Sequence, residues 1–168
     1  MRIAMTAGNV GSALGRAWLG GGEDVIFGVP NPADPKYRSL PEEKMRTAPE
    51  AARGAEIIVL ATPWPATEAA VKSLGDLSGK IVIDCTNPLG MGPDGLQLVL
   101  GHTTSGGEQV ASWAPAAAVF KTLNQIGAEN MDRAALFPVR PVMWIDQALN
   151  RGRGQNFGFA ITSRSEAA

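Results

Sequence analysis

The sequence predicts an α/β fold, namely a doubly wound Rossmann-type sheet of mostly parallel strands with helices on both faces. Three observations carry this prediction. Short apolar runs alternate along the chain with segments of helical periodicity. Two of these runs are continuous and rich in β-branched residues, which is typical of strands buried on both faces. A glycine-containing turn follows the first apolar run and opens the first helical segment, where a dinucleotide-binding turn would lie.

The expected elements follow one another in regular alternation. Strands are expected at residues 3–5, 24–27, 56–61, 80–84, 117–123 and 142–145. Helices are expected at residues 10–19, 50–53, 67–74 and 107–113. Strands that alternate with helices form βαβ units, and their right-handed crossovers build a parallel sheet. The 168 residues suit a single NAD(P)-binding domain over 1–168.

Composition narrows the classes of function. The net charge is -1 and no long run of one sign occurs, which argues against a nucleic-acid surface and a polybasic membrane patch. No signal peptide and no run of 18 apolar residues is present, so we expect a soluble cytoplasmic protein. Cys85 and His102 are the only residues of their types, which excludes an intrachain disulfide and a Cys/His zinc site, and no metal site is predicted. The single histidine and scattered serines form no convincing Ser/His/Asp set, so no catalytic residue is predicted.

The turn after the first strand is the leading candidate for a phosphate-binding site. It reads Thr6-Ala7-Gly8-Asn9-Val10-Gly11. Gly8 would let the backbone approach a pyrophosphate, and Gly11 would let the helix pack closely on the strand. The helix N-terminus would supply N–H donors and the positive end of its dipole. Thr6 stands where such motifs have their first glycine, and a plain glycine-containing turn is the alternative interpretation.

The end of the second strand bears on the choice between NAD and NADP. Residues 27–32 contain no carboxylate of the kind that binds the ribose hydroxyls of NAD. Asn31 lies in this stretch, and the cations Lys36 and Arg38 follow it. This pattern favours the 2′-phosphate of NADP, and an ordinary solvated loop is the alternative.

The third and fourth strands also end in candidate binding residues. Ala61, Thr62 and Pro63 follow the third strand, and Asn87 and Pro88 follow the fourth. The Asn87 side chain has donors and an acceptor that suit a carboxamide or a substrate carbonyl, whereas the alternative is an Asx-type turn before the proline.

Three further residues have an ordinary interpretation beside a functional one. Trp64 would either cover a flat ring or simply pack in the fold. Glu108 is expected in the first turn of a capped helix. His102, in the loop before that helix, would be either a general acid or an unremarkable loop residue.

Several segments, in order, resemble the NADPH-dependent reductases of the 8-hydroxy-5-deazaflavin coenzyme, coenzyme F420. The similar segments are residues 1–4, 8–15, 27–29, 84–89, 104–111 and 119–131. The resemblance implies NADP(H) on the first turn and after the second strand, with its nicotinamide near Thr62, Pro63 and Asn87. It further implies an oxidoreductase that passes hydride directly between NADP(H) and a deazaflavin or a similar small-molecule acceptor. Such a reaction depends on ring alignment more than on a strong acid or base.

The sequence departs from this family in three places. The first turn is one residue shorter and has Thr6 for glycine, and Pro30 stands where the family usually has arginine. The C-terminal part looks abbreviated, as if a βαβ unit of on the order of 30 residues were absent at the Met143–Trp144 junction. A non-catalytic dinucleotide-binding module and an inactive truncated relative therefore remain alternatives. An apolar patch left exposed by the absent unit would point to a partner or a homo-oligomer.

Overall fold

The structure, a computed structural model, describes residues 1–101, 103–132, 142–144 and 160–162 of the 168-residue chain. The chain divides into two compact units, Met1–Asp132 and Arg133–Ala168. In the second unit, β9 (Val142–Trp144) and β10 (Ala160–Thr162) pair antiparallel. The expected strand at 142–145 is thus present up to residue 144. The single domain over 1–168 stays a prediction, and most of the segment expected to be abbreviated lies outside the described residues, as does His102.

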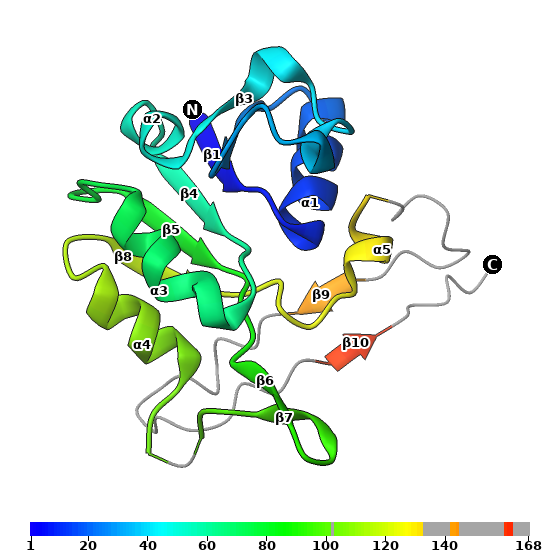
Figure 1. The fold of residues 1–168 in the computed structure, drawn as a ribbon, viewed down its shortest axis with the longest axis vertical. Helices are drawn as coiled ribbons and strands as arrows, with labels where there is room; N and C mark the ends of the chain where they lie inside the picture. The colour runs from blue at the N-terminus through cyan, green and yellow to red at the C-terminus, as the bar shows by residue number, and fades with distance from the viewer. Residues whose placement is uncertain (102, 133–141, 145–159, 163–168) are drawn as a thin grey trace. The chain divides into compact units, whose positions relative to one another are not determined.

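The first unit contains a six-stranded parallel sheet (Figure 1). Its strands are β1 (Arg2–Thr6), β2 (Asp24–Val29), β3 (Met45–Thr47), β4 (Ile57–Leu60), β5 (Ile81–Asp84) and β8 (Ala118–Lys121). They lie in the order β3-β2-β1-β4-β5-β8, and every neighbouring pair is parallel. The strand order therefore reverses between β1 and β4, and the predicted doubly wound Rossmann-type fold is confirmed.

Helices cover both faces of this sheet. They are α1 (Asn9–Gly20), α2 (Ala48–Arg53), α3 (Trp64–Ser73), α4 (Gly106–Trp113) and α5 (Ala128–Met131), with short 3-10 turns η1 (Pro35–Tyr37) and η2 (Glu42–Lys44). Successive residues of β1 alternate between two cores. Met5 packs in a core with Leu14 of α1, and Ala4 packs in the other with Ala51 of α2 and Val71 of α3. The sheet is thus buried on both sides, as its apolar runs predict.

Most expected elements are present, with shifted ends. Helix α3 begins at Trp64 rather than at residue 67, because Pro63 and Pro65 occupy its N-cap and first turn, where a missing N–H costs nothing. Strand β8 ends at Lys121 rather than at residue 123. Strand β3 and a hairpin of β6 (Leu89–Gly92) and β7 (Gly95–Leu98) were not expected from the sequence.

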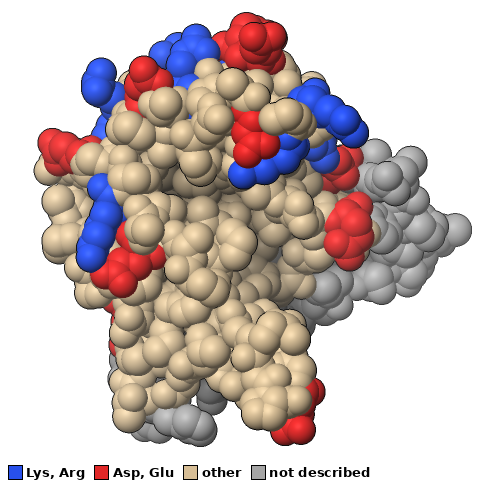
Figure 2. Space-filling view, in the orientation of Figure 1, with Lys and Arg blue, Asp and Glu red and all other residues tan. Residues whose placement is uncertain are grey.

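The β6–β7 hairpin carries exposed apolar side chains. Met91, Leu96 and Leu98 are 79%, 67% and 61% exposed. Lys and Arg side chains on the face shown in Figure 2 lie mainly toward the end that carries β3, away from the hairpin. Such a patch is the kind that would contact a partner, and the expected homo-oligomer stays a prediction. Among the described residues, no helix has the length and apolar character needed to cross a membrane.

Candidate functional site

The carboxyl ends of the parallel strands bring the predicted site residues to one edge of the sheet. Leu60, Asp84 and Lys121 lie side by side in register at the ends of β4, β5 and β8. Thr6 ends β1 on the other side of β4. In an open parallel sheet this edge, near the reversal of strand order, is where ligands bind.

The turn between β1 and α1 has the close packing that a dinucleotide fingerprint requires. A Cβ added to Gly11 would lie 2.0 Å from the carbonyl oxygen of Thr6. A Cβ on Gly15 would lie 2.2 Å from the ring of Phe27. Helix α1 therefore lies closer to β1 and β2 than any side chain at these two positions would allow, which is the role predicted for Gly11.

The N-cap residue of α1, Gly8, leaves the first N–H groups of the helix without a side-chain acceptor. Gly8, the N-cap, has an extended backbone and no side chain to accept from the first turn. The carbonyl of Gly8 accepts the first helical hydrogen bond from the N–H of Ser12, at 2.8 Å. The N–H groups of Asn9, Val10 and Gly11 therefore have no acceptor within the helix. Together with the helix dipole they suit an anion such as a pyrophosphate.

Two other residues of the turn are engaged with the fold. The N–H of Ala7 donates to the carbonyl of Gly28, at 3.2 Å. The buried Thr6 hydroxyl donates to the carbonyl of Val59, at 3.2 Å, and accepts from the N–H of Ala61, at 2.7 Å. Thr6 thus joins β1 to β4, and its role as a cofactor-binding residue stays a prediction.

Lys36 and Arg38, the two candidate partners of a 2′-phosphate in the loop after β2, differ in the contacts of their side chains. The ammonium of Lys36 pairs with Asp34, at 2.9 Å, and lies 4.8 Å from the centre of the Tyr37 ring. The Lys36 backbone N–H and side chain lower the pKa of the Asp34 carboxyl, and Asp34 in turn raises the pKa of Lys36. Arg38 is exposed and has no ion pair with the described residues. Asn31 turns its side-chain oxygen to the N–H of Ala33, at 3.1 Å.

Hydrogen bonds join the loop after β4 to α3, and the ring of Trp64 at the start of that helix packs internally. The hydroxyls of Thr62 and Thr67 lie 3.1 Å apart, and Thr67 also donates to the carbonyl of Pro63. The Trp64 ring packs on that of Trp113 from α4, with centroids 5.5 Å apart and a tilt of 38°. The packing interpretation of Trp64 is therefore the one that the structure supports.

Asn87 uses its side chain on a distant segment rather than on its own turn. Its Nδ2 donates to the backbone carbonyl of Asn124, at 2.9 Å, and its Oδ1 accepts from Nδ2 of Asn124, at 3.0 Å. The Asx-type turn in this loop belongs instead to Asp84, whose Oδ1 accepts from the N–H of Thr86, at 2.8 Å. The Asx alternative for Asn87 is therefore wrong, and its contact with a carboxamide stays a prediction, as does the role of Pro88.

A charged pair that the sequence analysis missed lies beneath this loop. Asp84 is fully buried, and its Oδ2 lies 3.0 Å from the ammonium of Lys121. Lys121 also donates to the carbonyl of Thr86, so it ties the end of β5 to the start of the loop that carries Asn87. Next to Asp84, burial first and the Asp84 charge second raise the pKa of the Cys85 thiol to about 12. Cys85 thus packs in the core at this edge, and its raised pKa disfavours the reactive thiolate.

Helix α4 begins with a capped first turn that contains Glu108, as predicted. The Ser105 hydroxyl accepts from the N–H of Glu108, and the Glu108 carboxylate accepts from the N–H of Ser105. These two bonds form a capping box, and the Ser105 bonds lower the pKa of the Glu108 carboxyl.

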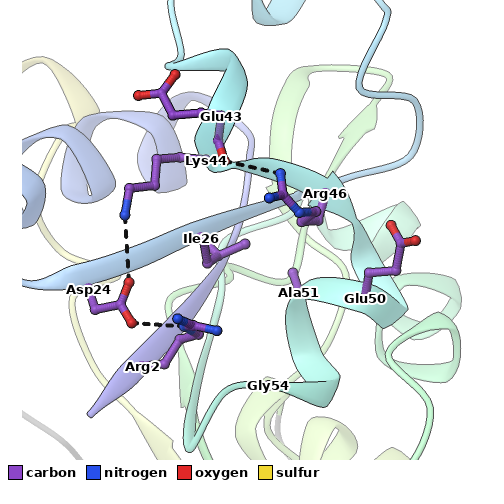
Figure 3. A pocket seen from close by; sticks show the side chains of 9 residues that line it. All are labelled: Arg2, Asp24, Ile26, Glu43, Lys44, Arg46, Glu50, Ala51 and Gly54. Atoms are coloured by element: carbon purple, nitrogen blue, oxygen red, sulfur yellow. Dashed lines mark hydrogen bonds and ion pairs between the residues drawn. The ribbon is translucent and has the colours of Figure 1, made fainter.

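A hollow lies away from the carboxyl edge, near the start of β1 and β2 (Figure 3). Its volume is about 490 Å³, and most of its charged groups bond to neighbouring protein groups. Arg2 lies 2.8 Å from Asp24, Lys44 lies 3.6 Å from the same carboxylate, and Arg46 donates to backbone carbonyls. The lysine and arginine side chains that line this hollow are therefore all engaged with protein groups. The described residues contain no cluster that would hold a metal ion.

Comparison with known proteins identifies the family. A family profile described as coenzyme F420-dependent NADP oxidoreductase matches residues 3–88, which is about half of the chain. The chain belongs to the F420-dependent NADP oxidoreductase family. The match spans β1 to the loop after β5, so it includes the glycine turn and Asn87 but not Lys121 or Asn124.

Solved structures agree with this assignment. A protein of Arthrobacter sp. FB24 described as an F420-dependent NADP-reductase is 30% identical, with a TM-score of 0.70 over 77% of this chain and 64% of its own. A hypothetical protein of Sinorhizobium meliloti is 25% identical, with a TM-score of 0.68 over 80% and 66%. An imine reductase of Bacillus cereus, 16% identical with a TM-score of 0.58, shares the fold. No curated protein matches the sequence. The chain spans about two thirds of the first two relatives.

Proposed function

We propose that this family member binds NADP(H) across the carboxyl edge of its sheet and passes hydride between the nicotinamide and a deazaflavin of the F420 type, or a similar small-molecule acceptor. The observation that carries the proposal is the turn after β1. There Gly11 brings α1 against the carbonyl of Thr6, and Gly8 leaves the first N–H groups of the helix open. This combination of close approach and open donors suits a pyrophosphate.

The remaining contacts follow from the direction of the sheet. A dinucleotide whose pyrophosphate lies at α1 extends its adenosine half toward β2 and its nicotinamide half toward β4 and β5. The adenosine half would then lie by Asn31, Lys36 and Arg38. The nicotinamide would lie by Ala61, Thr62, Pro63, Asn87 and Pro88.

Arg38 is the better candidate for the 2′-phosphate. Lys36 already pairs with Asp34, whereas Arg38 is exposed and has no ion pair with the described residues. A guanidinium also binds phosphate oxygens in a bidentate manner, which an ammonium does not. Arg38 would therefore bind the 2′-phosphate in place of the arginine that this family usually has at the position of Pro30.

The first experiment is a titration of NADPH and of NADH into the purified protein, followed by nicotinamide fluorescence. We expect tighter binding of NADPH. Arg38→Ala should weaken NADPH about tenfold, the usual effect of losing one charge-assisted phosphate contact, and leave NADH unchanged. Arg53→Ala, which removes another exposed arginine, is the matched control. Equal affinity of the wild type for NADH and NADPH would refute the NADP assignment.

The second experiment tests turnover, with NADPH and oxidised coenzyme F420 under anaerobic conditions. The hydride leaves C4 of the nicotinamide and enters C5 of the deazaflavin, which takes a proton from water, so NADP⁺ and reduced deazaflavin form in equal amounts. If the absorption bands of NADPH and of oxidised F420 disappear at the same rate, the proposal is supported. Because the chain spans only 64% of its F420-related neighbour, tight NADPH binding without turnover would support the non-catalytic module instead.

A further inference from the structure

Three side-chain amides form a continuous series at the ends of β5 and β8. Asn87 donates through Nδ2 to the backbone carbonyl of Asn124, and its Oδ1 accepts from Nδ2 of Asn124. Oδ1 of Asn124 then accepts from Nε2 of Gln125. We call this series the amide relay. All three side chains are partly buried, and all lie where the carboxyl edge predicts a ligand.

The direction of the amide relay is fixed by its first member. A backbone carbonyl can only accept, so the group of Asn87 that faces it must be the NH₂ group. The Oδ1 of Asn87 then requires a donor from Asn124, and the Oδ1 of Asn124 requires a donor from Gln125. The relay therefore ends in Oε1 of Gln125, an acceptor. The amide orientations thus follow from the network and are not interchangeable.

This terminal acceptor has no donor. Oε1 of Gln125 and Oγ1 of Thr122 are the two buried side-chain atoms without a hydrogen-bond partner in the described part of the chain. Both belong to the four residues that follow β8. Buried polar atoms are almost always paired, so two unpaired atoms within one short segment require an explanation.

The backbone of the same segment is held in an unfavourable conformation. Leu123 has a φ of 63°, and it is the single non-glycine residue with positive φ among the described residues. Its side chain packs at the border of the core on the α1 face, and the N–H of Thr122 is anchored to the carbonyl of Asp84, at 3.1 Å. Strain of this kind persists where surrounding contacts impose it, and it concentrates at binding sites.

We infer that Oε1 of Gln125 accepts a hydrogen bond from the carboxamide NH₂ of the bound nicotinamide. The inference rests on the proposed function. A dinucleotide has two amino groups that can donate, and the adenine one belongs to the β2 side of the crevice. The carboxamide is the amino group on the β5 side. It also carries a carbonyl, to which the unpaired hydroxyl of Thr122 is able to donate.

Gln125 is thereby a specificity-determining residue that orients the reacting ring. A nicotinamide turned by half a revolution about its glycosidic bond presents its other face to the acceptor. A hydrogen bond to the carboxamide selects one of the two orientations. Gln125 as a whole is partly exposed, and the ligand would reach Oε1 while Nε2 keeps its bond to Oδ1 of Asn124.

The test compares three ligands by titration: NADPH, its 3-acetylpyridine analogue and 2′-phospho-ADP-ribose. The acetyl group keeps the carbonyl and lacks the NH₂ group, and the third ligand lacks the ring. The wild type should bind NADPH about fivefold more tightly than the analogue, which corresponds to one neutral hydrogen bond. Gln125→Met should abolish this difference and leave the affinity for 2′-phospho-ADP-ribose unchanged.

Two further variants control the result. Gln97→Met makes the same change at an exposed site and should alter none of the three affinities. Gln125→Glu keeps an acceptor and should retain the preference for NADPH, so it tests the idea even if Gln125→Met unfolds. A preference for NADPH that survives Gln125→Met, or that is absent from the wild type, overturns the inference alone. A wild type that binds neither NADPH nor 2′-phospho-ADP-ribose overturns the proposed function as well.

Discussion

Gly11→Ala is the substitution that tests the central feature of this fold most directly. Gly11 lies in the first turn of α1, and its added Cβ would lie 2.0 Å from the Thr6 carbonyl oxygen and 3.4 Å from Cβ of Ala61. The carbonyl oxygen is backbone at the end of a central strand, so it has no rotamer by which to withdraw. Ordinary contacts of a Cβ begin near 3.4 Å. Helix α1 must therefore move away from β1 by roughly 1 Å to accept the methyl group, a displacement that well-packed cores resist.

The expected loss of stability follows from two opposing effects. Forcing extra volume into a packed interior costs about 3 kcal/mol when the backbone has to shift. Alanine in a helix is more favourable than glycine by about 1 kcal/mol. The net free energy of unfolding should therefore fall by about 2 kcal/mol. For a chain of this length, that loss lowers Tm by about 4–8 °C.

The same helix contains a matched control. Gly20 is the last residue of α1, and a Cβ placed there would meet nothing within 4 Å. Gly20→Ala should therefore raise the free energy of unfolding by about 0.5–1 kcal/mol, because only the helix preference acts. Urea denaturation followed by circular dichroism measures both variants. If Gly11→Ala is as stable as Gly20→Ala, α1 does not lie as close to β1 as the reasoning requires.

Three further outcomes are expected. Thr6→Val should lower the free energy of unfolding by about 2 kcal/mol, because it leaves the N–H of Ala61 buried without its acceptor, and Thr6→Ser should recover most of that loss in urea titrations. Lys121→Met should cost about 3 kcal/mol by leaving the Asp84 carboxylate buried and unpaired, and adding Asp84→Asn should restore part of it. Since the pKa of Cys85 is raised to about 12, a disulfide reagent should fail to modify the native protein at pH 8 and should react fully in guanidinium. Rapid labelling of the native thiol, or a double variant less stable than Lys121→Met alone, would contradict the packing described for this edge.

The parts of the fold that the sequence could predict are those with local signals. Strand β4 is a run of four buried or partly buried apolar residues, and the glycine turn follows β1 at a fixed spacing. Strand β3 has no such signal. It is three residues long with an exposed Arg46 at its centre, and it is a strand because it pairs with the edge of β2. The β6–β7 hairpin has alternating apolar residues, but its two strands are four residues long and together contain three glycines, which strands disfavour.

The residues of the candidate site likewise include some with a local sequence signal and some without one. Gly8, Gly11 and Asn87 could be found because each follows a strand within a recognisable spacing. Asp84 and Lys121 could not, since they are 37 positions apart and meet only through the parallel register of β5 and β8. The contact between Asn87 and Asn124 spans the same separation and depends on the same register. The sequence shows only that Lys121 ends an apolar run. Its position beside the buried Asp84 follows from the pairing of β5 with β8.

Thr6, the departure from the glycine pattern, has a structural explanation of its own. The registered pairing of β1 with β4 ends at Met5 and Val59. Beyond that point the Thr6 hydroxyl continues it, because it bonds the carbonyl of Val59 and the N–H of Ala61. A glycine at this position would remove these two hydrogen bonds at the point where the strand order reverses. Thr6 therefore joins β1 to β4 beside the proposed binding edge, while Gly8 and Gly11 of the predicted dinucleotide turn are both retained. The substitution is thus compatible with dinucleotide binding, and the choice between an enzyme and a binding module rests on the acceptor side of the site.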